Sequence, residues 1–122
     1  MSFSLHHVQI AMPVGGEDRA RAFYGAIIGL TESPKPEDMR KRGGCWFEGG
    51  TARIHLGVEL EFSPARTAHP ALQISDFIAL KQKLLDAGYE LSPVNPIDGL
   101  SRFFVNDPFG NRIEIIASEH LT

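Results

Sequence analysis

The stretch Arg53-Ile54-His55-Leu56 has a counterpart near the end of the chain, Arg112-Ile113-Glu114-Ile115, and the two stretches together indicate a duplication. A second pair lies upstream, where His7 opens His7-Val8-Gln9-Ile10 and His69 opens His69-Pro70-Ala71-Leu72-Gln73-Ile74. The two histidines lie 62 residues apart, and His55 and Glu114 lie 59 residues apart, close to half of the 122-residue chain. We therefore expect a duplicated fold in which each half carries one metal-competent side chain near its start and one near its end.

Composition indicates one ordinary globular domain over residues 1–122. Hydrophobic residues make up 43% of the chain, its net charge is −3 and it has no basic block, so we expect no nucleic-acid partner and no anionic membrane partner. The N-terminus has no apolar run of signal-peptide length, which favours a soluble, cytoplasmic protein. Cys45 is the single cysteine, so no internal disulfide can form, and we interpret it as an inert thiol.

The first half, about residues 4–60, reads as β-α-β-β-β. Val8, Ile10 and Met12 alternate with polar or small residues, as in a half-buried strand. We then expect a helix that ends at Gly29, a short strand from Leu30, a polar loop over 33–42, and two strands near Gly44–Glu48 and Ala52–Glu59.

The second half, about residues 68–118, repeats this order after a linker over 61–68. The expected elements are a strand over 69–75, a helix with Asp76 as its N-cap and Gly88 at its end, a short strand over 89–91, and strands over Arg102–Asn106 and Asn111–Ala117. The sequence thus predicts an α+β fold in which two tandem β-α-β-β-β modules form a cupped mixed sheet with helices on the outer face.

Strand alternation places the candidate ligands on the sheet face that the helices do not cover. That face is predicted to carry His7, His55, His69, Glu114, Gln9 and Gln73. Imidazole and carboxylate ligands suit Zn, Fe(II), Mn, Ni or Co, and a catalytic site needs about three of them with open positions for substrate. Because these side chains come from different strands, alternation alone does not establish that they converge.

Each of these candidate residues also has an interpretation in which it has only a structural role. A histidine at a strand start is often only a polar end residue, and Glu114 could simply face solvent. We interpret His6 as structural, the segment over 34–42 as a solvated flap edge, and Trp46, Phe47 and Phe103 as packing residues. Arg102 and Arg112 could bind an anionic substrate, although exposed strand arginines are common.

Longer motifs resemble the vicinal oxygen chelate superfamily, the group of glyoxalase I, bleomycin-resistance proteins and extradiol dioxygenases. The resemblance covers nearly the whole chain. It is carried by Leu5-His6-His7-Val8-Gln9-Ile10-Ala11-Met12, Arg21-Ala22-Phe23-Tyr24 with Gly29-Leu30, His69-Pro70-Ala71-Leu72-Gln73-Ile74 and Asp107-Pro108-Phe109-Gly110-Asn111-Arg112-Ile113-Glu114.

The resemblance implies a divalent metal ion bound by His7, His69 and Glu114, with His55 at the fourth ligand position. Members similar to glyoxalase I commonly have a glutamate there, so we expect little glyoxalase I activity. We expect His55 and Glu114 to take part in catalysis and Gln9, Gln73 and Arg102 to contact a small-molecule substrate.

Two functions follow from the resemblance. The first is a metal-dependent lyase, isomerase or transferase that chelates vicinal oxygens of its substrate. The alternative is a non-catalytic small-molecule binding or antibiotic-resistance protein of the bleomycin-resistance type. Small members of the superfamily often build each site across a homodimer, which implies that His7 and His55 come from one subunit and His69 and Glu114 from the other.

Overall fold

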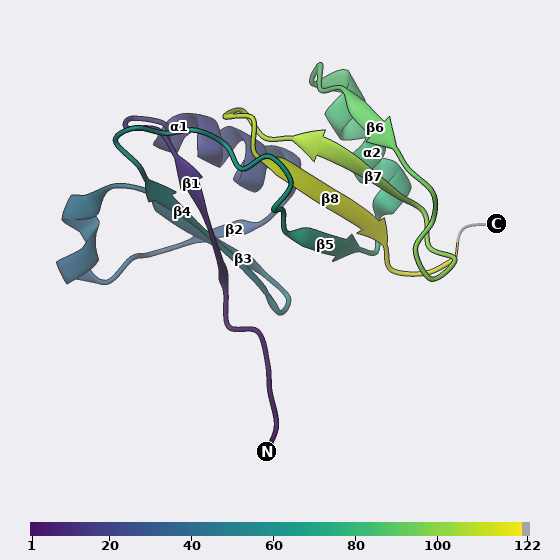
Figure 1. Ribbon diagram of the computed structural model, residues 1–122, viewed down its shortest axis with the longest axis horizontal. Helices are drawn as coiled ribbons and strands as arrows, with labels where there is room; N and C mark the ends of the chain where they lie inside the picture. Colours follow the sequence, from purple (N-terminus) through teal and green to yellow (C-terminus); the bar gives the residue numbers. More distant parts are fainter. Residues whose placement is uncertain (121–122) are drawn as a thin grey trace. The chain divides into compact units, whose positions relative to one another are not determined.

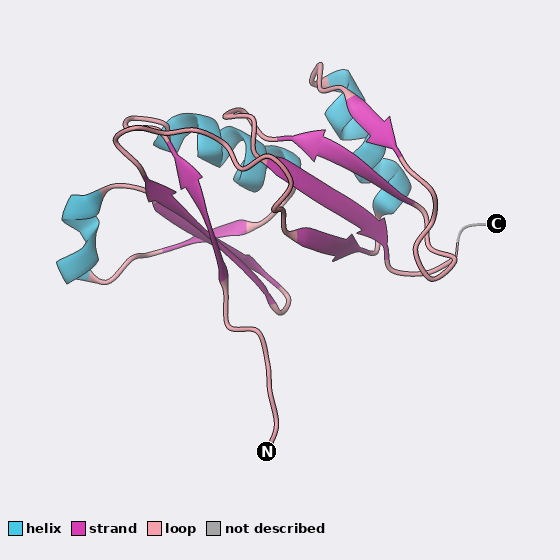
Figure 2. Ribbon diagram, in the orientation of Figure 1, coloured by secondary structure: helices cyan, strands magenta, loops and turns pink. Residues whose placement is uncertain are grey.

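The computed structural model describes residues 1–120 and divides the chain into two compact units, with the boundary between Pro64 and Ala65 (Figure 1). The boundary falls inside the linker expected over 61–68. Each unit is a four-stranded mixed sheet with helical segments of its own. Figure 2 shows the strands and helices by colour.

In the first module the sheet has the strand order β1-β4-β3-β2. β1 and β4 are parallel, and the other neighbouring strands are antiparallel. Its elements are β1 (Val8–Met12), the helix α1 (Glu17–Ala20), which continues as the π-helix η1 (Arg21–Ile27), β2 (Thr31–Ser33), the 3-10 helix η2 (Glu37–Arg42), β3 (Cys45–Gly49) and β4 (Ala52–Val58).

The second module has the same topology, with the strand order β5-β8-β7-β6 and β5 parallel to β8. Its elements are β5 (Ala71–Ile74), α2 (Phe77–Asp86), β6 (Leu91–Pro93), β7 (Arg102–Asn106) and β8 (Arg112–Ala117). The predicted α+β class and the two β-α-β-β-β modules are therefore confirmed. The joining of both sheets into one cup stays a prediction. Within residues 1–120, every helix is too short or too polar to cross a membrane.

Apolar residues that alternate along the strands form the core of each module, as the sequence predicts. In the first module, Phe47 pairs with Ile54 in the sheet and its ring lies 5.7 Å from that of Tyr24 on the helix. In the second, Phe103 pairs with Ile115 and lies 5.3 Å from the ring of Phe77. The interpretation of Phe47 and Phe103 as packing residues is confirmed, since both are almost completely buried.

Both candidate histidines that were expected to open strands lie before them instead. β1 begins at Val8 and β5 at Ala71, so His7 and His69 belong to the segments that lead into the strands. For β5 the reason is local, because Pro70 has no N–H to donate and takes part only through its carbonyl, which accepts from the Glu114 N–H at 3.0 Å.

The short strand expected over 89–91 is displaced and runs from Leu91 to Pro93. Tyr89 still belongs to the helix end, because its N–H donates to the Leu84 carbonyl across Gly88, which has a φ of 89°. At the other end of α2, Asp76 occupies the N-cap position but makes no side-chain capping hydrogen bond. The expected polar loop over 33–42 contains the helix η2, which begins after Pro36.

Gly44 and Gly50 offer a direct test of the turn that leads into β3 and of the β3–β4 hairpin. Both have positive φ, 84° and 55°, but a Cβ on Gly44 would collide with the Leu56 carbonyl oxygen whereas one on Gly50 would meet open space. We expect Gly50→Ala to lower the free energy of unfolding by about 1 kcal/mol. Gly44→Ala should cost about 3 kcal/mol or more. Urea denaturation measures both, and equal losses would contradict the close approach of Gly44 to β4.

Candidate functional site

The first module holds His55 in an aromatic stack. In the sheet His55 on β4 pairs with Gln9 on β1 and with Trp46 on β3, so the three side chains share one face. The His55 ring is parallel to Trp46, with centroids 4.0 Å apart, and is stacked with His7 at 4.2 Å. His55 is only 7% exposed, so its ring plane is fixed before any ligand arrives.

The stack also determines the charge of His55. Burial lowers the pKa of His55 from its ordinary value of 6.5 to about 4, and the nearby His7, His6 and Arg53 act in the same direction. The ring is therefore neutral at neutral pH. A neutral imidazole is the form that binds a metal ion or accepts a hydrogen bond.

Two residues in this module differ from their sequence interpretation. Trp46 was interpreted as a packing residue, but its neighbours Cys45 and Phe47 enter the core while its own ring covers His55. His6 was interpreted as structural, yet it is exposed and its Nδ1 lies 2.9 Å from Nδ1 of His7. This contact occupies His7 Nδ1, so Nε2 is the ring nitrogen of His7 that remains for other partners.

The second module places Glu114 between two cationic or cation-binding groups. Its Oε1 lies 3.0 Å from Nε2 of His69, and its Oε2 accepts a hydrogen bond from Nη1 of Arg102 at 3.1 Å. The residue is 5% exposed. The alternative in which Glu114 simply faces solvent is therefore wrong.

His69 has an oxygen acceptor at each of its ring nitrogens. Nδ1 lies 2.7 Å from the Thr67 carbonyl, and Nε2 faces Glu114. A carbonyl and a carboxylate can only accept, so Nδ1 has to donate its hydrogen to Thr67. The contact between Nε2 and Oε1 of Glu114 then needs a proton, carried by either atom, or a metal ion bound by both.

Arg102 and Arg112 surround Glu114 and Phe104 with positive charge. Arg102 donates through Nε to the Asn95 carbonyl at 2.8 Å as well as to Glu114, so two of its donors already have protein partners. The guanidinium of Arg112 lies 4.7 Å from the centre of the Phe104 ring, a cation–π contact. Phe104 in turn presents its face or edge to His69 at 5.0 Å.

The strand registers show how the two modules correspond. Gln9 pairs with His55, and Ala71 pairs with Glu114. His7 lies two residues before Gln9, and His69 lies two residues before Ala71. The matched spacing of the candidate ligands in the sequence is therefore also present in the pairing of the strands. Trp46 and Phe104 also correspond, because they pair with His55 and Glu114 on the other side.

Gln9 and Gln73 do not correspond in the same way. Gln73 pairs with Ile116, two residues beyond the pairing of Glu114, and its side-chain amide donates to the Ala117 carbonyl at 3.4 Å. The side chain of Gln9 lies over Gly57, where a Cβ would collide with its amide. The substrate contacts expected of Gln9, Gln73 and Arg102 stay predictions.

The candidate ligands thus come together in pairs, His7 with His55 and His69 with Glu114. Among residues 1–120, no three side chains of His, Cys, Asp or Glu are arranged as a metal site, and the convergence of all four ligands stays a prediction. The second pair fits a metal ion, because ligand atoms on one ion at about 2.0–2.2 Å lie about 3 Å apart, as Nε2 and Oε1 do. Sequence reasoning missed Thr67, for which no motif gave a signal.

Cys45 behaves as the sequence predicts. Its thiol is buried, and burial raises its pKa from 9.0 to about 11, with Glu32 acting in the same direction. The thiolate that reacts with electrophiles and metals is therefore suppressed.

The stack around His55 predicts a pH dependence of stability in chelator-treated protein. The unfolded chain takes up a proton at His55 near pH 6.5, whereas the folded protein does so only near pH 4. The free energy of unfolding should therefore be highest above pH 6.5 and fall between pH 6.5 and 4, with His55 accounting for about 1–3 kcal/mol of that loss. His55→Gln should flatten the fall, and His120→Gln, which removes an exposed histidine, should leave it unchanged. Parallel curves for wild type and His55→Gln in urea denaturation would contradict the stack.

Comparison with solved structures places the chain among glyoxalase-like proteins. It is 48% identical to a protein from Bacillus anthracis whose name assigns it to the glyoxalase family, with a TM-score of 0.91 and 98% of each chain covered. A fosfomycin resistance protein from Listeria monocytogenes is similar in fold, with 17% identity, a TM-score of 0.73 and coverage of 98% of this chain and 96% of that one. A lactoylglutathione lyase from Agrobacterium tumefaciens follows with 18% identity, a TM-score of 0.65 and coverage of 91% and 92%.

The family assignment agrees with these structures. A comparison with curated proteins finds no significant match. The sequence profile of the glyoxalase/bleomycin resistance protein/dioxygenase superfamily, however, matches residues 4–115, almost the whole chain. Together with the 48% identity to the Bacillus anthracis protein and the two β-α-β-β-β modules, this match shows that the chain belongs to the glyoxalase/bleomycin resistance protein/dioxygenase superfamily.

Proposed function

We propose that this protein is a metal-dependent enzyme of the glyoxalase type, a lyase, isomerase or transferase that binds vicinal oxygens of a small-molecule substrate. The observation that carries the proposal is the arrangement around His69. Its Nδ1 is committed to the Thr67 carbonyl, so its Nε2 is directed at the Glu114 carboxylate at a separation of 3.0 Å that suits two ligands of one ion.

His7, His69 and Glu114 would hold the ion, and His55 would lie at it or beside it. When bound, a divalent ion polarises substrate oxygens and stabilises negative charge that develops on them. This donor set carries one carboxylate and three imidazoles. It lacks the second carboxylate that glyoxalase I-like members use, which supports a reaction other than the glyoxalase I isomerisation.

The remaining residues of the site fix the orientation of the ligands. Arg102 binds Oε2 of Glu114 and leaves Oε1 on the side of His69. Trp46 holds the plane of His55, which is neutral at neutral pH and so can accept a proton or donate its lone pair. A site of this kind is preorganised, because its side chains need not rearrange when the substrate binds.

A non-catalytic small-molecule binding protein is the second candidate, and the ion pair between Arg102 and Glu114 favours it. The Arg102 guanidinium lies 3.1 Å from the carboxylate and can balance its buried charge without any metal. Metal affinity separates the two functions, because only the first needs Glu114 as a ligand.

We expect untagged protein to bind one divalent ion per chain in a calorimetric titration. Glu114→Ala should weaken binding by more than about 100-fold, because even groups that only orient a ligand contribute about 10–100-fold. Glu48→Ala is the matched control, since Glu48 lies on β3 with an exposed side chain and only a 3.9 Å contact to Arg53. If Glu114→Ala and Glu48→Ala bind metal as tightly as wild type does, the proposed site is wrong.

We further propose a homodimer in which His7 and His55 of one subunit meet His69 and Glu114 of the other. Mixing two variants that each lack one proposed metal ligand tests this arrangement. His7→Ala and Glu114→Ala proteins, unfolded together and refolded, should recover metal sites in mixed dimers, because one of the two sites then has all its ligands. Sedimentation should show a dimer at micromolar concentration. A monomer with full metal occupancy would exclude the arrangement.

A further inference from the structure

The segment between β2 and β3 forms one wall of a small pocket on the open face of the first sheet. The pocket has a volume of about 150 Å³. Gln9, Trp46 and Gly57 line it from the sheet, and Lys35, Met39 and Arg42 line it from the segment around η2. The segment was expected to be a solvated flap edge, so this pocket is a feature that the sequence did not predict.

The charged side chains that line the pocket are both cationic. They are Lys35 and Arg42, and no carboxylate contributes to the lining. Glu37 and Asp38 belong to the first turn of η2 and do not line it. Trp46 and Met39 supply apolar surface beside these charges, and Gln9 supplies an amide that can donate or accept a hydrogen bond.

The pocket shares two residues with the His55 stack. Trp46 covers the His55 ring, and Gln9 pairs with His55 in the sheet. A ligand group in the pocket would therefore lie next to His55.

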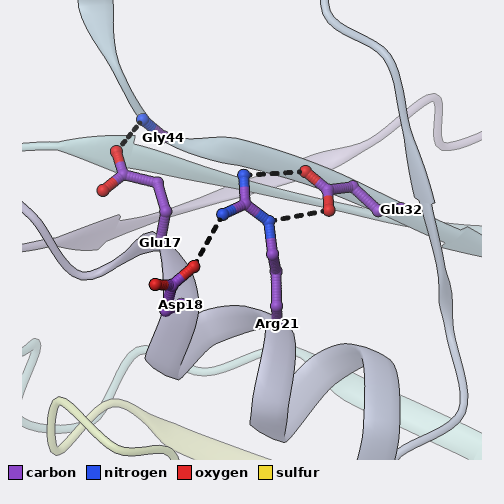
Figure 3. A network of polar contacts seen from close by, with 5 residues as sticks. All are labelled: Glu17, Asp18, Arg21, Glu32 and Gly44. Atoms are coloured by element: carbon purple, nitrogen blue, oxygen red, sulfur yellow. Dashed lines mark hydrogen bonds and ion pairs between the residues drawn. The ribbon is translucent and has the colours of Figure 1, made fainter.

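A network of ion pairs and hydrogen bonds fixes both ends of this wall (Figure 3). At the start, Glu32 on β2 accepts from Nε of Arg21 at 2.8 Å. At the end, the Gly44 N–H donates to Oε2 of Glu17 at 2.8 Å. Within the wall, Lys35 donates through Nζ to the Gly43 carbonyl, so the pocket is shaped before a ligand enters.

We propose that this pocket binds an oxyanion group of the substrate, such as a carboxylate, phosphate or phosphonate. The Arg42 guanidinium has a planar set of donors that matches two oxygens of such a group, and the Lys35 ammonium keeps further donors besides the one on Gly43. The absence of a side chain at Gly57 leaves room for the amide of Gln9 over the strand. The proposal deepens the proposed function by naming a substrate class, namely small molecules with an anionic group next to the atoms that react.

The test uses methylphosphonate as the probe and the chelator-treated chain of residues 1–122, so its outcome is independent of metal binding. Titration followed by ¹H–¹⁵N NMR should give saturable shifts at the amides of Gly43 and Gly57 and at the Trp46 indole. Arg42→Ala should weaken binding by about tenfold, because charge-assisted hydrogen bonds are the strong ones. Arg42→Lys should retain part of the affinity because it keeps the charge.

Lys41→Ala is the matched control, because Lys41 is the neighbouring cation on η2 and does not line the pocket. It should bind the probe as wild type does, and the uncharged dimethyl ester of methylphosphonate should not bind. The proposal is overturned if wild type shows no saturable shift, if Arg42→Ala and wild type bind equally well, or if the shifts appear only around Arg102 and Arg112. Failure of metal binding with normal binding of the probe would refute the proposed metal enzyme and leave the oxyanion pocket standing.

Discussion

The buried carboxylate of Glu114 is the charge that the second module has to balance. A carboxylate that is 5% exposed needs partners for its charge, and two nitrogen atoms lie within 3.1 Å of it, Nη1 of Arg102 at Oε2 and Nε2 of His69 at Oε1. The hydrogen bond from His69 Nδ1 to the Thr67 carbonyl then decides which ring nitrogen faces the carboxylate. Nε2 and Oε1 are therefore the two atoms of this module through which the proposed metal ion would bind.

Equivalent positions in the strand pairing of the two modules carry different side chains. The position held by Glu114 in the second module is held by His55 in the first, and the aromatic residue beside it is Phe104 in one and Trp46 in the other. Burial has opposite consequences for the two groups. Glu114 is paired with Arg102 and faces His69, whereas His55 is stacked between Trp46 and His7 and stays neutral chiefly because burial lowers its pKa. Duplication of the backbone thus does not duplicate the chemistry of the site.

Alternation of apolar residues predicted the strands and the faces that they bury, because each sheet has a core on one side and alternation records burial directly. It placed Phe47 in the core and His55 on the open face correctly. Alternation also places Trp46 on the open face, between the buried Cys45 and Phe47, whereas its aromatic character had suggested a packing residue. The contact of Arg102 with Glu114 and the pocket that η2 forms beside Trp46 gave no signal in the sequence. The start of β1 at Val8 also depended on pairing with β4 rather than on local propensity.

The most direct measurement of the central claim is histidine ¹⁵N NMR of the untagged protein during titration with Zn²⁺. The account predicts that His69 binds zinc through Nε2 at one equivalent per chain while Nδ1 keeps its proton on the Thr67 carbonyl, and that Glu114→Ala loses this stoichiometric change. Ring nitrogen signals of His69 that stay unchanged beyond several equivalents of zinc would contradict it, as would zinc binding through Nδ1.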